Sequence, residues 1–219
     1  MTQEVLIPKM RRIERRKFKI PLLSLVLVAL GLLMIIFSSF IGFELKHYVV
    51  PISVFFGKAM FVEDYIYSFY YIPQLPVIMF VGAALGQKIG TMAVFLYLIL
   101  GLFFIPIFGL GGGISYLGEY SCGYILACFP VVAVCSGILG KRHSILTTFL
   151  VAIFGILTIH FCGIIYMILV ALIKQDSWSF ISGWINVQSG IKIVYDIVGT
   201  IVAFFVGKFI NEGLRFITD

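Results

Sequence analysis

The chain has 219 residues, of which 61% are hydrophobic and only 12% are charged. Soluble domains carry about 25% charged residues, so this chain has too little polar material to cover a water-exposed surface. The composition therefore predicts an integral membrane protein and excludes soluble enzymes and nucleic-acid-binding domains.

Basic residues are concentrated near the N-terminus, where seven of the sixteen Lys and Arg residues lie between Lys9 and Lys19. The cytoplasmic flanks of membrane spans carry such an excess, so residues 1–20 are predicted to be a cytoplasmic basic tail. Residues 21–219 then form one membrane domain. A secretory signal peptide fits less well, because the apolar stretch that follows is longer than the ~7–15 residues of a signal-peptide core.

Six apolar segments follow the tail, and each is predicted to be a transmembrane helix. They cover approximately residues 21–43, 71–85, 91–104, 123–139, 145–173 and 190–210. Residues 44–70 are more polar and rich in Tyr and Phe, which predicts an amphipathic segment at the outer membrane interface. Residues 174–180 are predicted to be a polar loop. The predicted fold class is an all-α integral membrane protein with six transmembrane helices.

The distribution of positive charge predicts the orientation of these spans. An even number of spans places both termini on one side of the membrane. With that side as the cytoplasm, twelve Lys and Arg residues lie inside, three lie outside, and Lys192 falls within the last span. This bias predicts cytoplasmic N- and C-termini, with a Gly-rich outer loop between helices 3 and 4.

The Gly-rich loop runs from Phe108 to Tyr116 with the sequence FGLGGGISY. Glycine allows positive φ angles and lets the backbone approach a ligand closely. Irregular backbone at membrane depth is tolerated where it is buried in protein or lines a cavity. We therefore expect this loop to be the lid or floor of a small-molecule site. Polar side chains near the same outer end are Gln74, Ser115, Tyr116, Ser121 and Tyr124.

Two ionisable residues, Lys192 and Asp196, lie at the start of the last span. Ionisable residues inside spans are costly, which makes them candidate functional residues. Two interpretations stay open: the pair, spaced i and i+4, neutralises itself, or Lys192 faces an anionic group such as a ligand carboxylate. His160 in the fifth span is expected to be a hydrogen-bonded structural residue. The four cysteines are expected to be apolar packing residues, with no metal site.

The stretch from Gln74 to Tyr124 resembles the signature of the BioY family, the substrate-binding (S) components of energy-coupling-factor (ECF) biotin transporters. The positions in register are Gln74, Gly82, Gly86, Gly90, Tyr97, Gly101, Pro106, Phe108, Gly111, Gly112, Gly113, Tyr116, Gly123 and Tyr124. Two family motifs differ here. The family's PTGGY is Tyr120-Ser-Cys-Gly-Tyr124, and its Asp-x-x-Lys is Ser189-Gly-Ile-Lys192.

This resemblance implies biotin uptake, with the chain as the high-affinity component that captures biotin from the outer side. The implied partners are a transmembrane coupling subunit and an ATPase pair, in a bacterial cytoplasmic (inner) membrane, with no cofactor and no nucleic acid. The expected substrate-binding residues are Gln74, Phe108, Gly111, Gly112, Gly113, Tyr116, Ser121, Tyr124, Ser189, Lys192 and Asp196.

Three alternatives stay open. The first is an S component or a solitary transporter for another vitamin or small carboxylate. The second is a structural subunit whose Gly-rich loop serves only close helix packing. The third is an intramembrane enzyme, which the sequence disfavours because it contains neither HExxH nor GxSxG. The sequence also has no Walker A motif, so ATP hydrolysis by that route is not expected.

Overall fold

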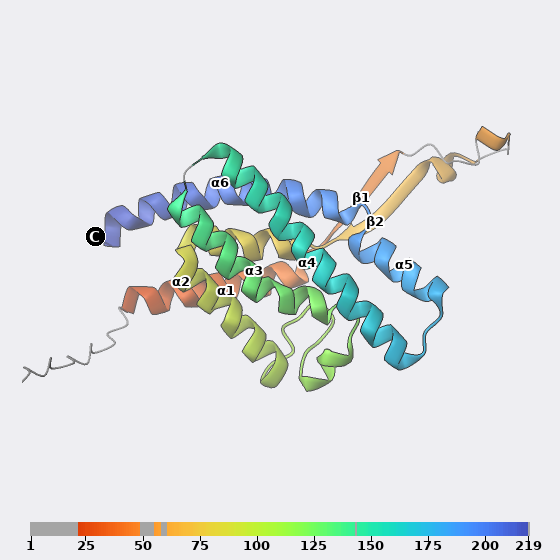
Figure 1. Ribbon diagram of the computed structural model, residues 1–219, viewed down its shortest axis with the longest axis horizontal. Coiled ribbons are helices and arrows are strands. Elements are labelled where there is room, and N and C mark those ends of the chain that lie inside the picture. The colour runs from red at the N-terminus through yellow and green to blue at the C-terminus, as the bar shows by residue number, and fades with distance from the viewer. Residues whose placement is uncertain (1–21, 49–54, 58–60, 143, 219) are drawn as a thin grey trace, which may run out of the picture.

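The computed structural model describes residues 22–48, 55–57, 61–142 and 144–218. The described part of the chain holds six α-helices and a two-stranded sheet. The helices form an elongated bundle, with the two strands projecting from one end and the C-terminus at the other (Figure 1). The predicted cytoplasmic tail, residues 1–20, lies outside the described residues.

Five segments are long and apolar enough to cross a membrane, so the chain is a multi-pass membrane protein. Three of them are α1, α3 and α4, whose bounds follow the predicted spans closely. This agreement has a physical cause, because a long apolar run in lipid must satisfy its backbone hydrogen bonds within a helix. The five segments are Leu22–Phe40 (α1), Gln74–Phe103 (α2), Cys122–Lys141 (α3), Ile145–Lys174 (α4) and Trp178–Leu214, which contains α5 (Trp178–Ser189) and most of α6 (Lys192–Thr218).

Helix α2 turns back on itself at Gly86, where φ is 76° and ψ is 172°. A Cβ atom on Gly90 would lie 2.8 Å from the Val81 carbonyl oxygen and 2.7 Å from Gly82 Cα. In a continuous helix, residues this far apart in sequence would be separated by about 12 Å along the axis. The predicted segments 71–85 and 91–104 are therefore the two arms of a helical hairpin (Figure 1).

The first arm of α2 lies at the centre of the bundle and packs against α1, α3 and α6. Each of these contacts is made where one helix has a glycine, so that the two backbones approach closely. The contacts are Gly31 on Val81, Gly82 on Val132 and Gly207 on Ala83.

The segment 44–70 differs from the prediction, because it contains two paired strands. Strands β1 (Phe43–Tyr48) and β2 (Ile66–Tyr71) are antiparallel, with Phe43 opposite Tyr71 and Tyr48 opposite Ile66. The burial of β2 alternates residue by residue, a period-two pattern that indicates a strand. The prediction of an all-α chain therefore needs this correction. Residues 49–54 and 58–60 lie outside the described part.

The ribbon is held to the helices by the ring of Tyr195 on α6. Its centroid lies 5.4 Å from that of His47, 5.5 Å from that of Phe69 and 5.6 Å from that of Tyr71. The Tyr195 hydroxyl also lies 2.7 Å from His47 Nε2. A two-stranded ribbon is marginal by itself, so this packing fixes the base of the ribbon beside the start of α6.

Helix α5 is a second difference, because residues 174–180 were predicted to be a polar loop. Helix α4 ends where Gln175 adopts a left-handed conformation with φ of 60°, and α5 begins two residues after Asp176. Ser177 caps the new helix by accepting a hydrogen bond from the Phe180 amide at 3.4 Å. Only Gly190 and Ile191 separate α5 from α6.

Candidate functional site

The carboxylate of Asp196 on α6 is completely buried and is bonded by two other elements. Its Oδ1 accepts a hydrogen bond from the Tyr71 hydroxyl of β2 at 3.0 Å. Its Oδ2 lies 3.1 Å from Nε2 of His160 on α4. A buried carboxylate is tolerated only when it is paired and hydrogen-bonded, and these two contacts meet that requirement.

His160 extends this network to Ser189 and Tyr124. Its Nδ1 lies 2.8 Å from Ser189 Oγ, which lies 2.7 Å from the Tyr124 hydroxyl. Because a carboxylate is acceptor-only, Nε2 carries the proton that faces Asp196. In the neutral imidazole, Nδ1 then accepts from Ser189, and Ser189 accepts from Tyr124. One directed series of hydrogen bonds thus joins α3, α4, the end of α5, α6 and β2.

A second polar cluster surrounds Gln74 at the start of α2. Its Nε2 donates to the Tyr97 hydroxyl at 2.7 Å and to Ser39 Oγ at 3.1 Å. Ser39 Oγ and the Tyr97 hydroxyl are 2.9 Å apart. This triangle joins the end of α1 to both arms of α2.

The Gly-rich loop folds tightly onto the second arm of α2. Phe108 and Gly111 exchange two backbone hydrogen bonds of 2.9 Å, and the Gly113 amide donates to the Gly101 carbonyl at 2.8 Å. The φ angles of Gly111 and Gly113 are 124° and 85°, a region that side chains rarely adopt. A Cβ on Gly112 would lie 2.6 Å from Pro106 Cα. Packing and backbone conformation thus both require glycine here.

Aromatic side chains connect this loop to the second polar cluster. Phe108 is 1% exposed, and its ring centroid lies 5.2 Å from that of Tyr97 and 4.6 Å from that of Tyr116. Tyr116 belongs to the short 3-10 helix Ile114–Gly118, and its hydroxyl lies 3.0 Å from Ser121 Oγ. Burial raises the pKa of Tyr116 to about 12, so the phenol keeps its proton at neutral pH.

The structure therefore gathers the predicted side chains into two series of contacts. Gln74, Phe108, Tyr116 and Ser121 belong to one series, and Tyr124, Ser189 and Asp196 belong to the other. The two series meet at the start of α3, where the Tyr124 amide donates to the Ser121 carbonyl at 3.2 Å.

Lys192 is the first residue of α6, one turn before Asp196. Of the two open interpretations of Lys192 and Asp196, the direct pair is not formed, because Lys192 makes no salt bridge among the described residues. The two oxygens of Asp196 are bonded instead by His160 and Tyr71, while its charge still acts on Lys192 from one turn away. The positive charge of Lys192 adds to the positive end of the helix dipole.

Four residues of these networks were absent from the predicted site: Ser39, Tyr71, Tyr97 and His160. The sequence signal for Tyr97 was a polar hydroxyl within an apolar run, and Tyr71 and Ser39 gave no comparable signal. His160 was expected to be a hydrogen-bonded structural residue, and its bonds to Ser189 and Asp196 agree with that expectation.

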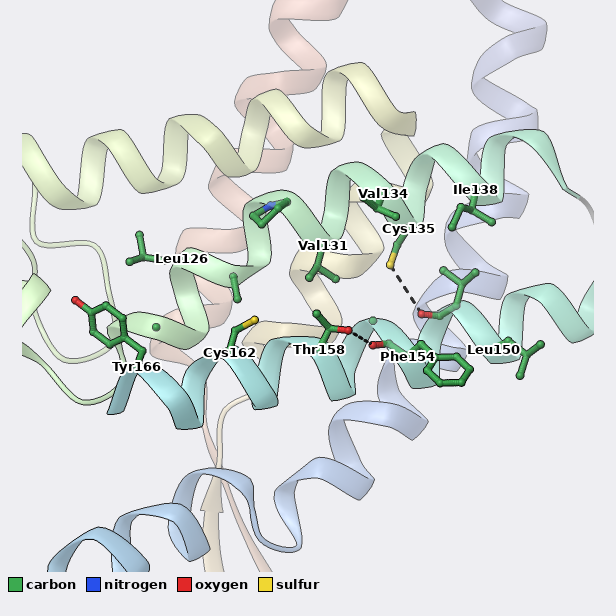
Figure 2. Close-up of a pocket in the computed structure, with 15 residues that line it drawn as sticks. Leu126, Val131, Val134, Cys135, Ile138, Leu150, Phe154, Thr158, Cys162 and Tyr166 are labelled. Atoms are coloured by element: carbon green, nitrogen blue, oxygen red, sulfur yellow. Dashed lines mark hydrogen bonds between the residues drawn. The ribbon is translucent and has the colours of Figure 1, made fainter. Parts of the chain in front are cut away.

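An apolar groove of about 700 Å³ lies elsewhere, between α3 and α4 (Figure 2). Its walls contain no charged side chain and none of the predicted site residues. A site that recognises a polar small molecule needs several convergent polar groups. We therefore place the candidate site at the two polar series rather than in this groove.

The sequence pattern of the BioY family matches residues 71–216, about two thirds of the chain. The chain belongs to the BioY family. The match contains most of the residues of both polar series, from Tyr71 to Asp196, while Ser39 on α1 lies outside it.

This BioY chain has curated relatives in an archaeon and a bacterium. It is 34% identical over 91 residues to a probable biotin transporter BioY of Pyrococcus horikoshii, and this aligned region covers 41% of this chain and 53% of that protein. It is 31% identical over 121 residues to a probable biotin transporter BioY of Lysinibacillus sphaericus, covering 52% of this chain and 61% of that protein. The chain thus spans between half and two thirds of the length of these relatives.

The BioY chain also has the fold of a solved protein, the S-component for biotin from an ECF-type ABC transporter. The TM-score is 0.60 at 22% sequence identity, and the match covers 86% of this chain and 90% of that chain. At this identity the likeness establishes the fold alone.

Proposed function

We propose that this BioY-family chain is the high-affinity binding component of an ECF-type transporter and captures biotin from the outer side of the membrane. The observation that carries the proposal is the side chain of Lys192, which makes no salt bridge among the described residues and lies next to a buried polar cluster. Biotin has a carboxylate, a polar ureido group and an apolar bicycle with its chain. The cluster offers one class of side chain for each of these three parts.

In this proposal the ligand carboxylate binds at Lys192. A helix N-terminus favours anions because the positive end of the helix dipole lies there. A charge-assisted bond from the ammonium group adds to this preference. Asp196 makes no salt bridge with Lys192, and its carboxylate is bonded by Tyr71 and His160 instead.

The remaining predicted residues fit the other two parts of biotin. Gln74, Ser121 and Ser189 offer hydrogen bonds to the ureido group, together with the backbone of Gly111, Gly112 and Gly113. The apolar bicycle packs on rings, for which the cluster offers Phe108, Tyr116 and Tyr124. Asp196 keeps His160 and Ser189 in position. Specificity then comes from a few polar groups in an otherwise apolar pocket.

Most of the proposed contact groups are buried, which sets a requirement for ligand entry. Phe108 and Tyr116 are 1% and 3% exposed. A ligand that touches them therefore needs the loop of residues 108–118 to move away from α2. We assign this loop the role of the lid over the site.

The proposal includes the topology and the partners. The two arms of α2 each cross the membrane, which gives six spans, two cytoplasmic termini and the Gly-rich loop on the outer face. The chain contains no GxxxxGK[ST] sequence for ATP binding. We therefore propose that a transmembrane coupling subunit and an ATPase pair supply the energy, in a bacterial cytoplasmic membrane. The chain itself binds and does not catalyse.

A different vitamin or small carboxylate is the second candidate ligand. Ser189 stands where the family motif has an acid, and Tyr120-Ser-Cys-Gly-Tyr124 stands where the family has PTGGY. Tyr124 itself is kept from that motif, and Ser189 shares a 2.7 Å hydrogen bond with it, so the change from an acid to Ser189 alters a contact of a kept residue. A changed contact of this kind favours a ligand with a different polar group at this point.

The experiment is an equilibrium titration of the detergent-purified chain with biotin and with biotinamide, which lacks the carboxylate charge. We expect the parent to bind biotin tightly and Lys192→Ala to bind it about 10- to 100-fold more weakly, the size of one hydrogen bond to a charged group. Lys192→Ala should leave biotinamide binding unchanged, because the double difference isolates the contact between Lys192 and the carboxylate.

Lys174→Ala is the matched control, since it removes the same charge from the end of α4. It should bind both ligands as the parent does. If Lys192→Ala weakens both ligands equally, the carboxylate is placed wrongly. If the folded parent binds neither ligand, biotin is the wrong ligand, and other vitamins should be titrated.

A further inference from the structure

The groove between α3 and α4 is built from two helical rows of apolar side chains. On α3 the row is Leu126, Pro130, Val134 and Ile138, and on α4 it is Leu150, Phe154, Thr158 and Cys162. Residues four apart share one face of a helix, so each row follows its helix along the groove. The labelled side chains from both helices line the groove in Figure 2.

The groove offers few polar groups to an occupant, and most of these already have a partner. The Thr158 hydroxyl donates to the Phe154 carbonyl of its own helix at 2.7 Å, and Cys135 Sγ lies 3.8 Å from the Val151 carbonyl oxygen. Several wall residues are open to the surroundings, with Val134 60% and Phe154 64% exposed. Because a polar occupant would lose its hydrogen bonds here, the groove favours a hydrocarbon.

The dimensions of the groove favour a chain over a helix. From Leu126 to Ile138 the groove follows α3 for about 18 Å, close to the ~15 Å of one leaflet of hydrocarbon. Its volume of about 700 Å³, spread over that length, gives a cross-section of roughly 40 Å². A helix with a diameter of ~10 Å needs roughly twice that area.

One end of the groove carries positive charge. The α3 row that ends at Ile138 continues to Lys141 and Arg142, one turn further along. Both residues are exposed, and neither takes part in an ion pair among the described residues. Basic residues at the end of a membrane helix attract anionic lipid headgroups.

We propose that the α3–α4 groove is a binding site for an anionic phospholipid. One acyl chain lies along the groove between the two apolar rows, and the headgroup phosphate lies at Lys141 and Arg142. This lipid site is separate from the candidate site for biotin, and it does not depend on the identity of that ligand.

The test uses tryptophan fluorescence in nanodiscs that mix phosphatidylglycerol and phosphatidylcholine, with bromine on the acyl chains of one lipid at a time. Phe154→Trp places the reporter in the groove. Phe161→Trp is the matched control, because Phe161 lies on the same helix, is 65% exposed against 64% for Phe154, and does not line the groove. The parent, with its two native tryptophans, supplies the baseline.

At equal mole fractions of the two lipids, we expect the site beside the reporter at 154 to hold brominated phosphatidylglycerol at least about fivefold more often than brominated phosphatidylcholine. This factor corresponds to the attraction of about one basic residue for an anionic lipid. The reporter at 161 should be quenched equally by both lipids. In the background Lys141→Gln/Arg142→Gln the preference at 154 should disappear. Lys174→Gln, which removes a charge at the far end of α4, should keep it.

Three outcomes would overturn the proposal. Equal quenching of the 154 reporter by both lipids in the parent background would show bulk lipid only. A preference that survives Lys141→Gln/Arg142→Gln would place the headgroup elsewhere. Protection of the 154 reporter from both lipids would show that another protein segment fills the groove.

Discussion

The Gly-rich loop gives the sharpest prediction, because the glycines at 111, 112 and 118, in and just after it, differ in backbone conformation or in what an added methyl group would meet. In Gly112→Ala the new Cβ would lie 2.6 Å from Pro106 Cα and 2.7 Å from the Gly101 carbonyl oxygen. Both are backbone atoms, so no side chain can rotate to make room. Overpacking costs about 1–3 kcal/mol, and a backbone clash belongs in the upper part of that range.

We expect this overpacking to raise the free energy of the loop in its folded conformation. If that conformation closes the site over the ligand, a cost of about 2–3 kcal/mol weakens biotin binding by about 30- to 150-fold. The assay is a biotin titration of each detergent-purified variant, with its thermal unfolding midpoint measured in the same buffer. A folded Gly112→Ala variant with the binding constant of the parent would refute the reasoning.

Two further variants separate steric clash from backbone strain. Gly118→Ala has no neighbouring atom within 4 Å of the new Cβ and no positive φ, so it should bind like the parent. Gly111→Ala also meets no atom within 4 Å, but its φ of 124° is unfavourable for alanine. Strain of this kind costs about 1–3 kcal/mol, so Gly111→Ala should weaken binding although it creates no clash.

The other predictions concern the buried hydrogen bonds and are read as thermal unfolding in detergent. Asp196→Asn removes a charged acceptor with two partners and should destabilise the chain by about 3 kcal/mol or more, whereas Tyr71→Phe removes one of those bonds and should cost about half as much. Ser189→Ala leaves two buried groups without a partner and should cost about 1–3 kcal/mol. The pKa of Tyr116 is raised to about 12 in the folded state, which contributes stability that is complete below pH 10 and disappears as the pH rises to 12. Between pH 10 and 12 the free energy of unfolding should therefore fall by about 3 kcal/mol less in Tyr116→Phe than in the parent.

Each of these predictions has a result that would contradict it. Equal midpoints for Asp196→Asn and the parent would mean that the carboxylate is not held by charged hydrogen bonds. Ser182→Ala is the control for Ser189, because Ser182 is exposed on the same helix and bonds only to the Ser179 carbonyl. The Ser189 prediction fails if both variants unfold alike. An identical alkaline decline for Tyr116→Phe and the parent would remove Tyr116 as a cause.

The spans were predictable from the sequence to the extent that apolar length decides the structure. The helices α1, α3 and α4 are such cases, since lipid forces a long apolar run to become a helix. The reversal of α2 was also visible, because Gly86 lies between two apolar runs. Helix α5 and the β1–β2 ribbon were missed because their hydrophobic pattern is weaker. The burial of β2 alternates in the structure, but its sequence from Ile66 to Tyr71 is aromatic on both faces and shows no apolar–polar alternation.

The pairings among the candidate site residues could not be predicted from the sequence, and the site itself stays a prediction. Spacing along α6 correctly brought Lys192 and Asp196 to one end of the helix, and the same spacing suggested that they pair. The structure gives Asp196 partners that are 36 and 125 positions away in the sequence. Helical periodicity describes neighbours within one helix only, so it carries no information about contacts to β2 or α4.

This pairing determines which groups at the start of α6 are free to bond a ligand. If Asp196 bonded Lys192, the ammonium group would already be engaged. Because Asp196 instead turns toward His160 and Tyr71, the ammonium group keeps its hydrogen bonds for another acceptor at the positive end of the α6 dipole. The charge of Asp196 still acts on Lys192 from one turn away, so a ligand carboxylate gains through a direct charge-assisted bond. The contacts of Asp196, a residue that need not touch the ligand, thus favour an anionic vitamin.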